Sequence, residues 1–195
     1  MRIIAGKYRS RPLRSLKGVD IRPTSDRLRE TLFNVLTAGN PEALEGTVWL
    51  DLYAGTGAVG IEALSRGAAL VYFVESSVQA SQLIAQNLSS LGIQQGFRIL
   101  KLEVVRGIRS LANDTSMVDF VFLDPPYRMH EAYGQAFDAL AQTNLLKPDG
   151  VVVAEHEKRF DPGDVCGGFH RYRELIQGDA GLSFYRTSAA YNSHE

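Results

Sequence analysis

Residues 48–60 read VWLDLYAGTGAVG, an apolar run that passes into a glycine-rich turn. The run over 48–53 predicts a strand, and residues 58–66 predict a helix that Gly67 stops. Glycines at positions 55, 57 and 60 give the junction a GxGxxG spacing, with which a backbone can turn tightly and approach a ligand closely. A strand, a glycine loop and a helix in this order predict the opening unit of a nucleotide-binding sheet.

The same alternation continues along the chain. Predicted strands cover 70–75, 97–102, 118–123 and 151–155, and predicted helices cover 78–91, 104–111 and 130–141. Near-continuous apolar strands that alternate with helices indicate a mostly parallel sheet with helices on both faces. Residues 172–176 and 182–187 flank a turn-forming segment and predict an antiparallel C-terminal hairpin at a sheet edge. The predicted fold class is therefore α/β.

Acidic residues at the ends of predicted strands narrow the choice of ligand. Glu75 follows the glycine loop by about 20 residues, where an acid can hold both ribose hydroxyls of an adenosine. Asp51 suits a cationic amine better than a pyrophosphate, which favours S-adenosylmethionine over NAD. Glu103 either accepts from the adenine amino group or is solvated. The candidate cofactor-binding residues are Asp51, Tyr53, Gly55, Thr56, Gly57, Glu75 and Glu103.

A second motif, Asp124-Pro125-Pro126-Tyr127, ends the strand predicted over 118–123. Asp124 offers a carboxylate acceptor, and each proline fixes its own φ and removes a donor, so that carbonyls remain able to accept. Tyr127 offers a ring face for stacking. Such a set can hold an exocyclic amine by its hydrogens and aim its lone pair at an electrophile. The four residues are predicted to be catalytic; the alternative is a proline-stiffened turn.

Composition bounds the class of protein. The chain has 195 residues, of which 45% are hydrophobic and 22% charged, as expected of one globular domain with a small appendage. Its single cysteine, Cys166, excludes an intrachain disulfide and favours a reduced cytosolic protein. No apolar run is long enough to span a bilayer. The four histidines lack metal-ligand spacing, so no metal site is expected.

Positive charge is concentrated near the N-terminus. Residues 1–29 hold nine basic and two acidic residues, a net charge of +7, whereas the whole chain carries −1 and the remainder therefore −8. A basic arm on an acidic body is typical of polyanion binding, and of nucleic-acid contact in particular. The alternative is a solvated, charged surface segment. The candidate RNA-binding residues are Arg2, Lys7, Arg9, Arg11, Arg14 and Arg22.

The arm is predicted to have structure of its own. Short strands at 2–6 and 11–13 predict a small hairpin, and Thr24 or Ser25 is predicted to cap a helix that Gly39, Asn40 and Pro41 end. We expect residues 1–40 to be an RNA-binding extension of hairpin and helix, and residues 41–195 to be a catalytic domain.

The motifs together resemble class I S-adenosylmethionine-dependent methyltransferases that modify exocyclic amines. The arm narrows the resemblance: RIIAG (2–6), RSRPL (9–13), RPTSDRLRE (22–30) and LFN (32–34) resemble the RsmD family, as do LYAGTG (52–57) and GIEALSRGA (60–68). The resemblance covers residue 1 to about residue 187. It implies a Rossmann-like methyltransferase sheet and a bacterial enzyme that methylates the N2 of one guanine in 16S ribosomal RNA.

The resemblance also implies the surroundings of the reaction. The substrate would be a 30S particle or an assembly intermediate, and the enzyme a cytoplasmic monomer that needs no metal and releases S-adenosylhomocysteine. The family usually has a shorter Asp or Asn at the position of Glu103, which weakens the case for its adenine contact.

Other functions fit the residues less well. An adenine-N6 methyltransferase acting on DNA or RNA would share the catalytic motif, and the motif alone does not separate it from a guanine-N2 enzyme. A protein-glutamine methyltransferase would favour Asn at position 124. A nicotinamide dehydrogenase would leave Asp124-Pro125-Pro126-Tyr127 unexplained, and a non-catalytic RNA-binding protein would not need both motifs. The absence of a Pro-Cys dipeptide argues against a cysteine nucleophile.

Overall fold

The computed structural model describes residues 1–15, 25–113 and 117–192. Two predictions, the RNA contact of Arg22 and the alternative N-cap Thr24, lie outside the described residues. Contacts divide the chain into two compact units, Met1–Leu102 and Glu103–Glu195. Each unit has its own strands, helices and buried apolar side chains.

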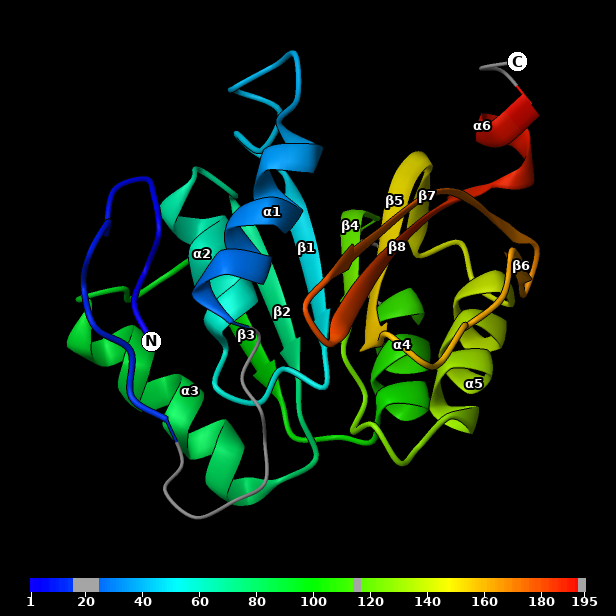
Figure 1. Cartoon of the computed structure of the whole chain (residues 1–195). Coiled ribbons are helices and arrows are strands. Elements are labelled where there is room, and N and C mark those ends of the chain that lie inside the picture. The colour runs from blue at the N-terminus through cyan, green and yellow to red at the C-terminus, as the bar shows by residue number, and fades with distance from the viewer. Residues whose placement is uncertain (16–24, 114–116, 193–195) are drawn as a thin grey trace. The chain divides into compact units, whose positions relative to one another are not determined.

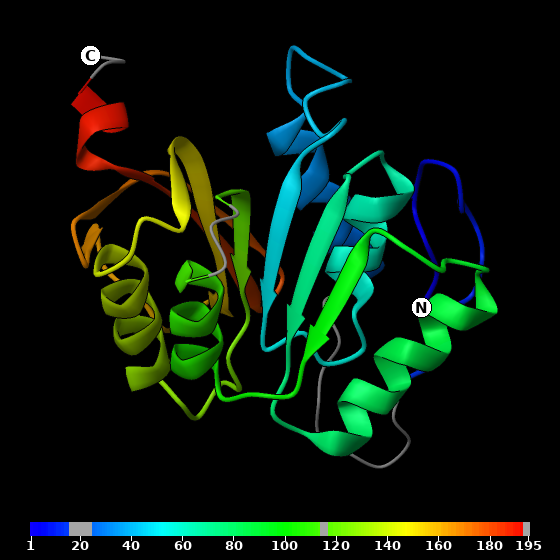
Figure 2. The ribbon, with the colours of Figure 1, turned by 180° about the vertical axis from the view of Figure 1, so that it is seen from behind.

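The first unit contains three parallel strands in the order β3-β2-β1. Figures 1 and 2 show β2 between the other two from opposite sides. Asp51 of β1 pairs with Phe73 of β2, so the carboxyl ends of these strands lie next to each other. The elements are α1 (Asp26–Leu36), β1 (Val48–Leu52), α2 (Ala58–Ser65), β2 (Leu70–Val74), α3 (Val78–Ser90) and β3 (Phe97–Leu100).

Helix α1 begins where the sequence predicted. Ser25 is the N-cap, and its hydroxyl accepts from the Leu28 N–H (3.1 Å). Phe33 is fully buried and stacks on Trp49 of β1, with ring centroids 5.4 Å apart. This apolar contact attaches α1 to the strands of the first unit.

The N-terminal hairpin forms with less strand than predicted. A single antiparallel bridge joins Arg2 and Pro12 instead of two short strands. The Ile3 N–H donates to the Arg11 carbonyl (3.0 Å) and the Ser10 N–H to the Ile3 carbonyl (2.8 Å). The ladder stops there because the next backbone donors of the segment bond to α2 instead.

Glu62 and Ser65 of α2 accept hydrogen bonds from those donors. The Glu62 carboxylate accepts from the Ile4 N–H (2.8 Å) and the Ala5 N–H (2.9 Å). Ser65 accepts from the Tyr8 N–H through its hydroxyl (3.0 Å) and from the Lys7 N–H through its carbonyl (2.7 Å). The basic segment is therefore attached to α2 through its backbone, which leaves its basic side chains exposed to solvent.

The second unit contains five strands in the order β4-β5-β8-β7-β6. Strands β4 and β5 are parallel, whereas β5–β8, β8–β7 and β7–β6 are antiparallel pairs. The elements are α4 (Val104–Asn113), β4 (Val118–Leu123), α5 (Glu131–Ala141), β5 (Leu146–Glu157), β6 (Val165–Cys166), β7 (Phe169–Gln177), β8 (Ala180–Thr187) and α6 (Ser188–Asn192). Figures 1 and 2 both show α4 and α5 side by side.

The C-terminal hairpin is confirmed as β7 and β8, with Gly178 in its turn at a φ of 65°. Its predicted place at the sheet edge is wrong, because β6 pairs outside β7. Strand β6 has only two residues, too few for a sequence pattern. Strand β5 also begins earlier than predicted, since Leu146 pairs with Val118 ahead of the buried run. Within the ranges described, no helix combines the length and apolarity needed to cross a membrane.

Candidate functional site

The glycine loop joins β1 to α2 with three distinct uses of glycine. Gly57 is the N-cap of α2 at a φ of 76°. A side-chain carbon on Gly60 would lie 2.4 Å from the Phe73 ring, so only glycine lets α2 pack this closely on β2. A carbon on Gly55 would meet only the Tyr53 carbonyl, at 3.8 Å. The space beside Gly55 can therefore receive a ligand against the backbone.

Glu75 lies directly after β2 and reaches the glycine loop. Its carboxylate accepts from the Gly55 N–H (2.9 Å) and from the Ser77 N–H (2.8 Å). Ser77 in turn caps α3, accepting from the Ala80 N–H (3.3 Å). The structure thus brings Gly55 and Glu75 together, as the strand–loop–helix–strand pattern predicted.

Asp51 is buried beneath the same loop, with 2% of its surface exposed. Burial raises the pKa of its carboxyl to about 8; the hydrogen bond from the Gly60 N–H (2.9 Å) lowers the pKa, and the charge of Glu75 raises it. A cation beside Asp51 would favour the ionised form. Its environment suits an ammonium group near the end of β1.

Asn87 of α3 holds the back of the glycine loop, and sequence reasoning missed it. Its side-chain amide donates to the Thr56 carbonyl (3.0 Å) and to the Arg14 carbonyl (3.2 Å), and it accepts from the Arg14 N–H (2.9 Å). Asn87 is fully buried. The sequence does contain a hint of this role. Asn87 lies four residues from both Leu83 and Leu91, so it falls on the apolar face of the predicted helix, where a polar residue is unexpected.

The five described residues of the predicted RNA-binding set all have exposed side chains, on the segment that α2 and α3 hold. Arg11 donates to the Ser90 carbonyl (3.1 Å), and Lys7 lies 5.4 Å from the centre of the Tyr8 ring. The backbone of Arg14 is held by Asn87. The segment therefore presents exposed cations on a backbone that α2 and α3 anchor. The five exposed residues of the predicted set are Arg2, Lys7, Arg9, Arg11 and Arg14.

In the second unit, the tetrad Asp124-Pro125-Pro126-Tyr127 leaves the end of β4. Asp124 and Tyr127 are half-buried, Pro125 is buried and Pro126 is exposed. The Met129 N–H donates to the Pro126 carbonyl (2.8 Å), which turns the chain toward α5. The tetrad is therefore a short structured turn that keeps Asp124 partly accessible.

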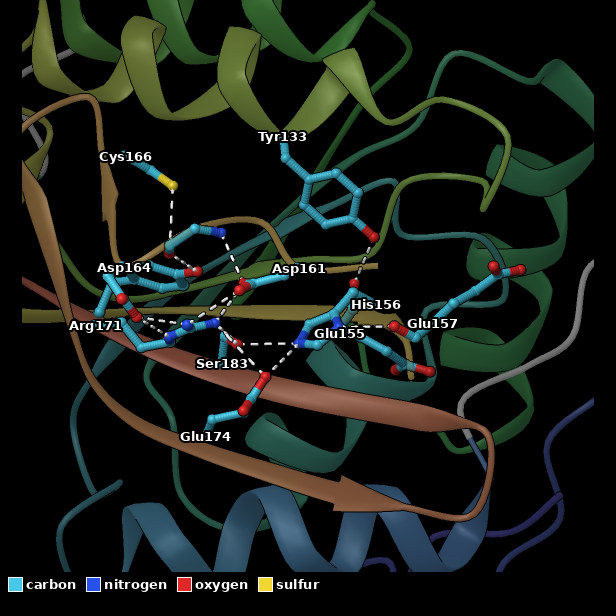
Figure 3. A network of polar contacts seen from close by, with 12 residues as sticks. Tyr133, Glu155, His156, Glu157, Asp161, Asp164, Cys166, Arg171, Glu174 and Ser183 are labelled. Carbon is cyan, nitrogen blue, oxygen red and sulfur yellow. Dashed lines mark hydrogen bonds and ion pairs between the residues drawn. The ribbon is translucent and has the colours of Figure 1, made fainter. Parts of the chain in front are cut away.

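Tyr133 of α5 lies beside this turn. Its hydroxyl donates to the Glu155 carbonyl at the end of β5 (2.7 Å), as Figure 3 shows. Burial raises the pKa of Tyr133, and the charges of Asp124 and Glu155 raise it further. Tyr133 therefore remains protonated and links α5 to the carboxyl end of β5.

Beyond Glu155 a polar network surrounds buried His156 (Figure 3). The His156 ring makes a 2.9 Å hydrogen bond with the Ser183 hydroxyl through Nε2 and a 3.0 Å contact with the Glu157 carbonyl through Nδ1. Glu174 lies 3.9 Å from the same Nε2. The network links β5, β7 and β8 through the side chains of His156, Glu174 and Ser183.

Arg171 of β7 holds the loop that follows β5 in place. It pairs with Asp161 (2.6 Å) and Asp164 (2.5 Å). The hydrogen bond to Asp161 raises the pKa of Arg171, and Arg171 lowers the pKa of Asp161. The Tyr185 hydroxyl also donates to the Gly163 carbonyl (2.9 Å). These contacts hold a seven-residue surface loop, 158–164, in one conformation.

Glu103 stands three residues beyond the end of β3 and is exposed. Its carbonyl accepts from the Gly107 N–H (2.9 Å) in the first turn of α4. Its adenine contact stays a prediction. The histidines and acids of the described residues form no group of three or more that could hold a metal ion.

Comparison with known proteins adds independent findings. The family described as "Conserved hypothetical protein 95" matches residues 1–186. Ribosomal RNA small subunit methyltransferase D of Haemophilus influenzae is 36% identical over 159 residues, which are 81% of this chain and 79% of that protein. A solved Escherichia coli structure, provisionally described as a methyltransferase, is 31% identical to this chain, with a TM-score of 0.80. The match covers 97% of this chain and 98% of the Escherichia coli chain.

A more distant structure shares the fold alone. A SAM-dependent methyltransferase of Agrobacterium tumefaciens is 16% identical to this chain, with a TM-score of 0.60. The match covers 81% of this chain and 60% of the Agrobacterium tumefaciens chain. These likenesses confirm the predicted α/β fold of class I methyltransferases.

Proposed function

The chain belongs to the RsmD family, described as "Conserved hypothetical protein 95", and on that premise we propose that it methylates small-subunit ribosomal RNA with S-adenosylmethionine as donor. The specific reaction we propose is transfer to the exocyclic N2 of one guanine in 16S RNA. The observation that carries the proposal is the hydrogen bond from the Gly55 N–H to the Glu75 carboxylate, which fixes the acid beside the glycine loop. The same chain has a partly accessible carboxylate, Asp124, at the end of β4.

The residues of the first unit fit this cofactor. Glu75 would accept from the ribose hydroxyls, the open space beside Gly55 would admit the ligand against the backbone, and buried Asp51 would face its ammonium group. Tyr53, Thr56 and Gly57 complete the loop. Glu103, which is the first residue of the second unit, is proposed to accept from the adenine amino group. When bound, the cofactor supplies an electrophilic methyl group.

The residues of the second unit suit the acceptor base. The Asp124 carboxylate and the Pro125 carbonyl would accept the two hydrogens of N2, which favours a pyramidal nitrogen and aims its lone pair. Tyr127 would stack on the base, which must leave its RNA stack to be reached. Pro126 keeps the turn stiff. Asp124 is thus the group through which the protein activates a weak nucleophile.

We further propose that residues 1–40 serve as an RNA-binding extension and residues 41–195 as the methyltransferase domain. The substrate would be a 30S particle or an assembly intermediate, and the enzyme would act as a cytoplasmic monomer. An adenine-N6 enzyme is the alternative, since the tetrad can hold either amine.

Labelled methyl transfer to small subunits tests the proposal. Subunits from a strain that lacks this protein should accept a labelled methyl group, and mass mapping should place it on guanine N2. A label on adenine N6 would support the alternative, and no label on RNA would overturn the proposed function.

Replacing Glu75 by alanine should weaken cofactor binding about 10- to 100-fold, because two hydrogen bonds to a charged acceptor are lost. Isothermal titration calorimetry measures this change. Glu75→Gln, which keeps one acceptor oxygen, should lose less. An unchanged affinity in Glu75→Ala would remove the ribose role of this carboxylate.

Neutralising Arg9, Arg11 and Arg14 to glutamine should weaken RNA binding and flatten its salt dependence. Each lost phosphate contact lowers the slope of log K against log salt by about 0.7 to 0.9. Filter binding at several salt concentrations gives the slope. The matched control neutralises three exposed arginines of the second unit and should leave the slope nearly unchanged: Arg106, Arg109 and Arg173. Equal slopes for both triple variants would argue against the role of the arm.

A further inference from the structure

The loop 158–164 presents an aromatic ring beside the tetrad turn. The Phe160 ring stacks on the His130 ring with centroids 4.1 Å apart and an interplanar angle of 12°. Phe160 also contacts the Tyr133 ring at 5.0 Å, tilted by 39°. Tyr133 is buried, Phe160 half-buried and His130 exposed. The three rings therefore lead from the interior of the second unit to its surface.

This aromatic group is close to the catalytic motif along the chain. His130 follows Tyr127 by three residues, and the hydrogen bond from Met129 to Pro126 tightens the turn between them. The Tyr133 pKa responds to the charge of Asp124. The exposed ring of His130 therefore belongs to the segment that leads directly from the tetrad into α5.

Positive charge accompanies the rings. Residues 103–195 hold fourteen acidic and nine basic residues, yet Arg128, Lys158 and Arg159 fall within the two segments that carry His130 and Phe160. All three cations are exposed. The acid nearest them in the loop, Asp161, is engaged by Arg171 (2.6 Å). Three exposed cations thus lie in the two segments that carry the rings, where exposed Glu131 and half-buried Glu157 also lie.

The loop is rigid enough to present a ring in a defined orientation. Arg171 joins Asp161 and Asp164, as Figure 3 shows. The Cys166 thiol also donates to the Pro162 carbonyl (3.0 Å). The Phe160 N–H itself donates to the Glu157 carbonyl (3.0 Å). These contacts anchor the loop at several points between β5 and β6.

We propose that His130 and Phe160 form a stacking platform for a nucleobase next to the target base of a single-stranded RNA segment. Arg128, Lys158 and Arg159 contact the adjoining phosphates. Unpaired bases stack readily on aromatic side chains, and nearby cations hold the backbone that links them. The platform rests on the proposed function, because the tetrad determines which RNA reaches it.

Fluorescence of a short single-stranded oligoribonucleotide, with 2-aminopurine beside a guanine, tests the platform without relying on catalysis. Stacking on the rings should quench the 2-aminopurine. Phe160→Ala should relieve the quench and weaken binding about tenfold or more, whereas Phe160→Trp should preserve both. His130→Ala should act in the same direction as Phe160→Ala. Tyr172→Ala, which removes an exposed ring of β7, is the matched control and should change neither signal.

The outcomes separate this inference from the proposed function. Unchanged quench and affinity in both Phe160→Ala and His130→Ala would overturn the platform, even if wild-type protein methylates RNA. Loss of quench in these variants with retained cofactor affinity would support it, even if wild-type protein transfers no methyl group to RNA. Equal losses in Tyr172→Ala would show nonspecific contact and also overturn it.

Discussion

Replacing Asp124 by alanine should reduce methyl transfer by at least about 10²- to 10³-fold, while cofactor affinity stays the same. Asp124 is half-buried at the end of β4, where its charge already influences Tyr133. Without this acceptor, the exocyclic nitrogen keeps its lone pair delocalised into the base. Single-turnover transfer to small subunits measures the rate, and calorimetry measures the affinity.

Two further variants sharpen this test. Asp124→Asn keeps one acceptor oxygen and should retain part of the rate, whereas Asp138→Ala removes an exposed acid of α5 and should leave the rate unchanged. Activity close to wild type in Asp124→Ala would show that the tetrad positions the base by its shape alone.

Replacing Glu62 by alanine should lower the free energy of unfolding by about 3 to 5 kcal/mol. The fully buried carboxylate accepts from the Ile4 and Ala5 N–H groups and from Arg66 (2.8 Å), and buried Arg29 lies 3.8 Å away. Its removal leaves two backbone donors without their acceptor and takes a charge away from the buried Arg29 guanidinium, which keeps its bond to Asp26 (2.9 Å). Urea denaturation followed by circular dichroism measures the loss.

Conservative and exposed changes serve as controls for Glu62. Glu62→Gln should lose most of the same stability, because both carboxylate oxygens accept and the amide nitrogen would face a donor. Glu30→Ala on the exposed face of α1 should stay within about 0.5 kcal/mol of wild type. A similar small loss for Glu62→Ala would mean that the hairpin does not depend on this carboxylate.

Much of the fold follows from local patterns in the sequence. The strand predicted at 118–123 matches β4, and helices α2, α3, α4 and α5 begin and end close to their predicted bounds, whereas α6 was not predicted. The link between Gly55 and Glu75 was predictable because adjacent parallel strands place their carboxyl ends at the same edge. These features need only periodicity and the rules of parallel sheets.

The parts that were missed depend on contacts between distant residues. Glu62 and Asn87 look like ordinary polar residues of helices until the N-terminal segment packs against them. His130 and Phe160 are separated by about thirty residues, and only the anchored loop brings their rings together. No local period encodes such a pair, so the three-dimensional structure was needed to find it.

The attachment of the basic segment to α2 has a consequence for the order of folding. The backbone donors of Ile4, Ala5 and Tyr8 have their acceptors 57 or 58 residues later in the chain. During synthesis the segment leaves the ribosome before those acceptors exist, and closing so long a loop is a late step. The basic segment is therefore expected to reach its final conformation only after α2 has formed.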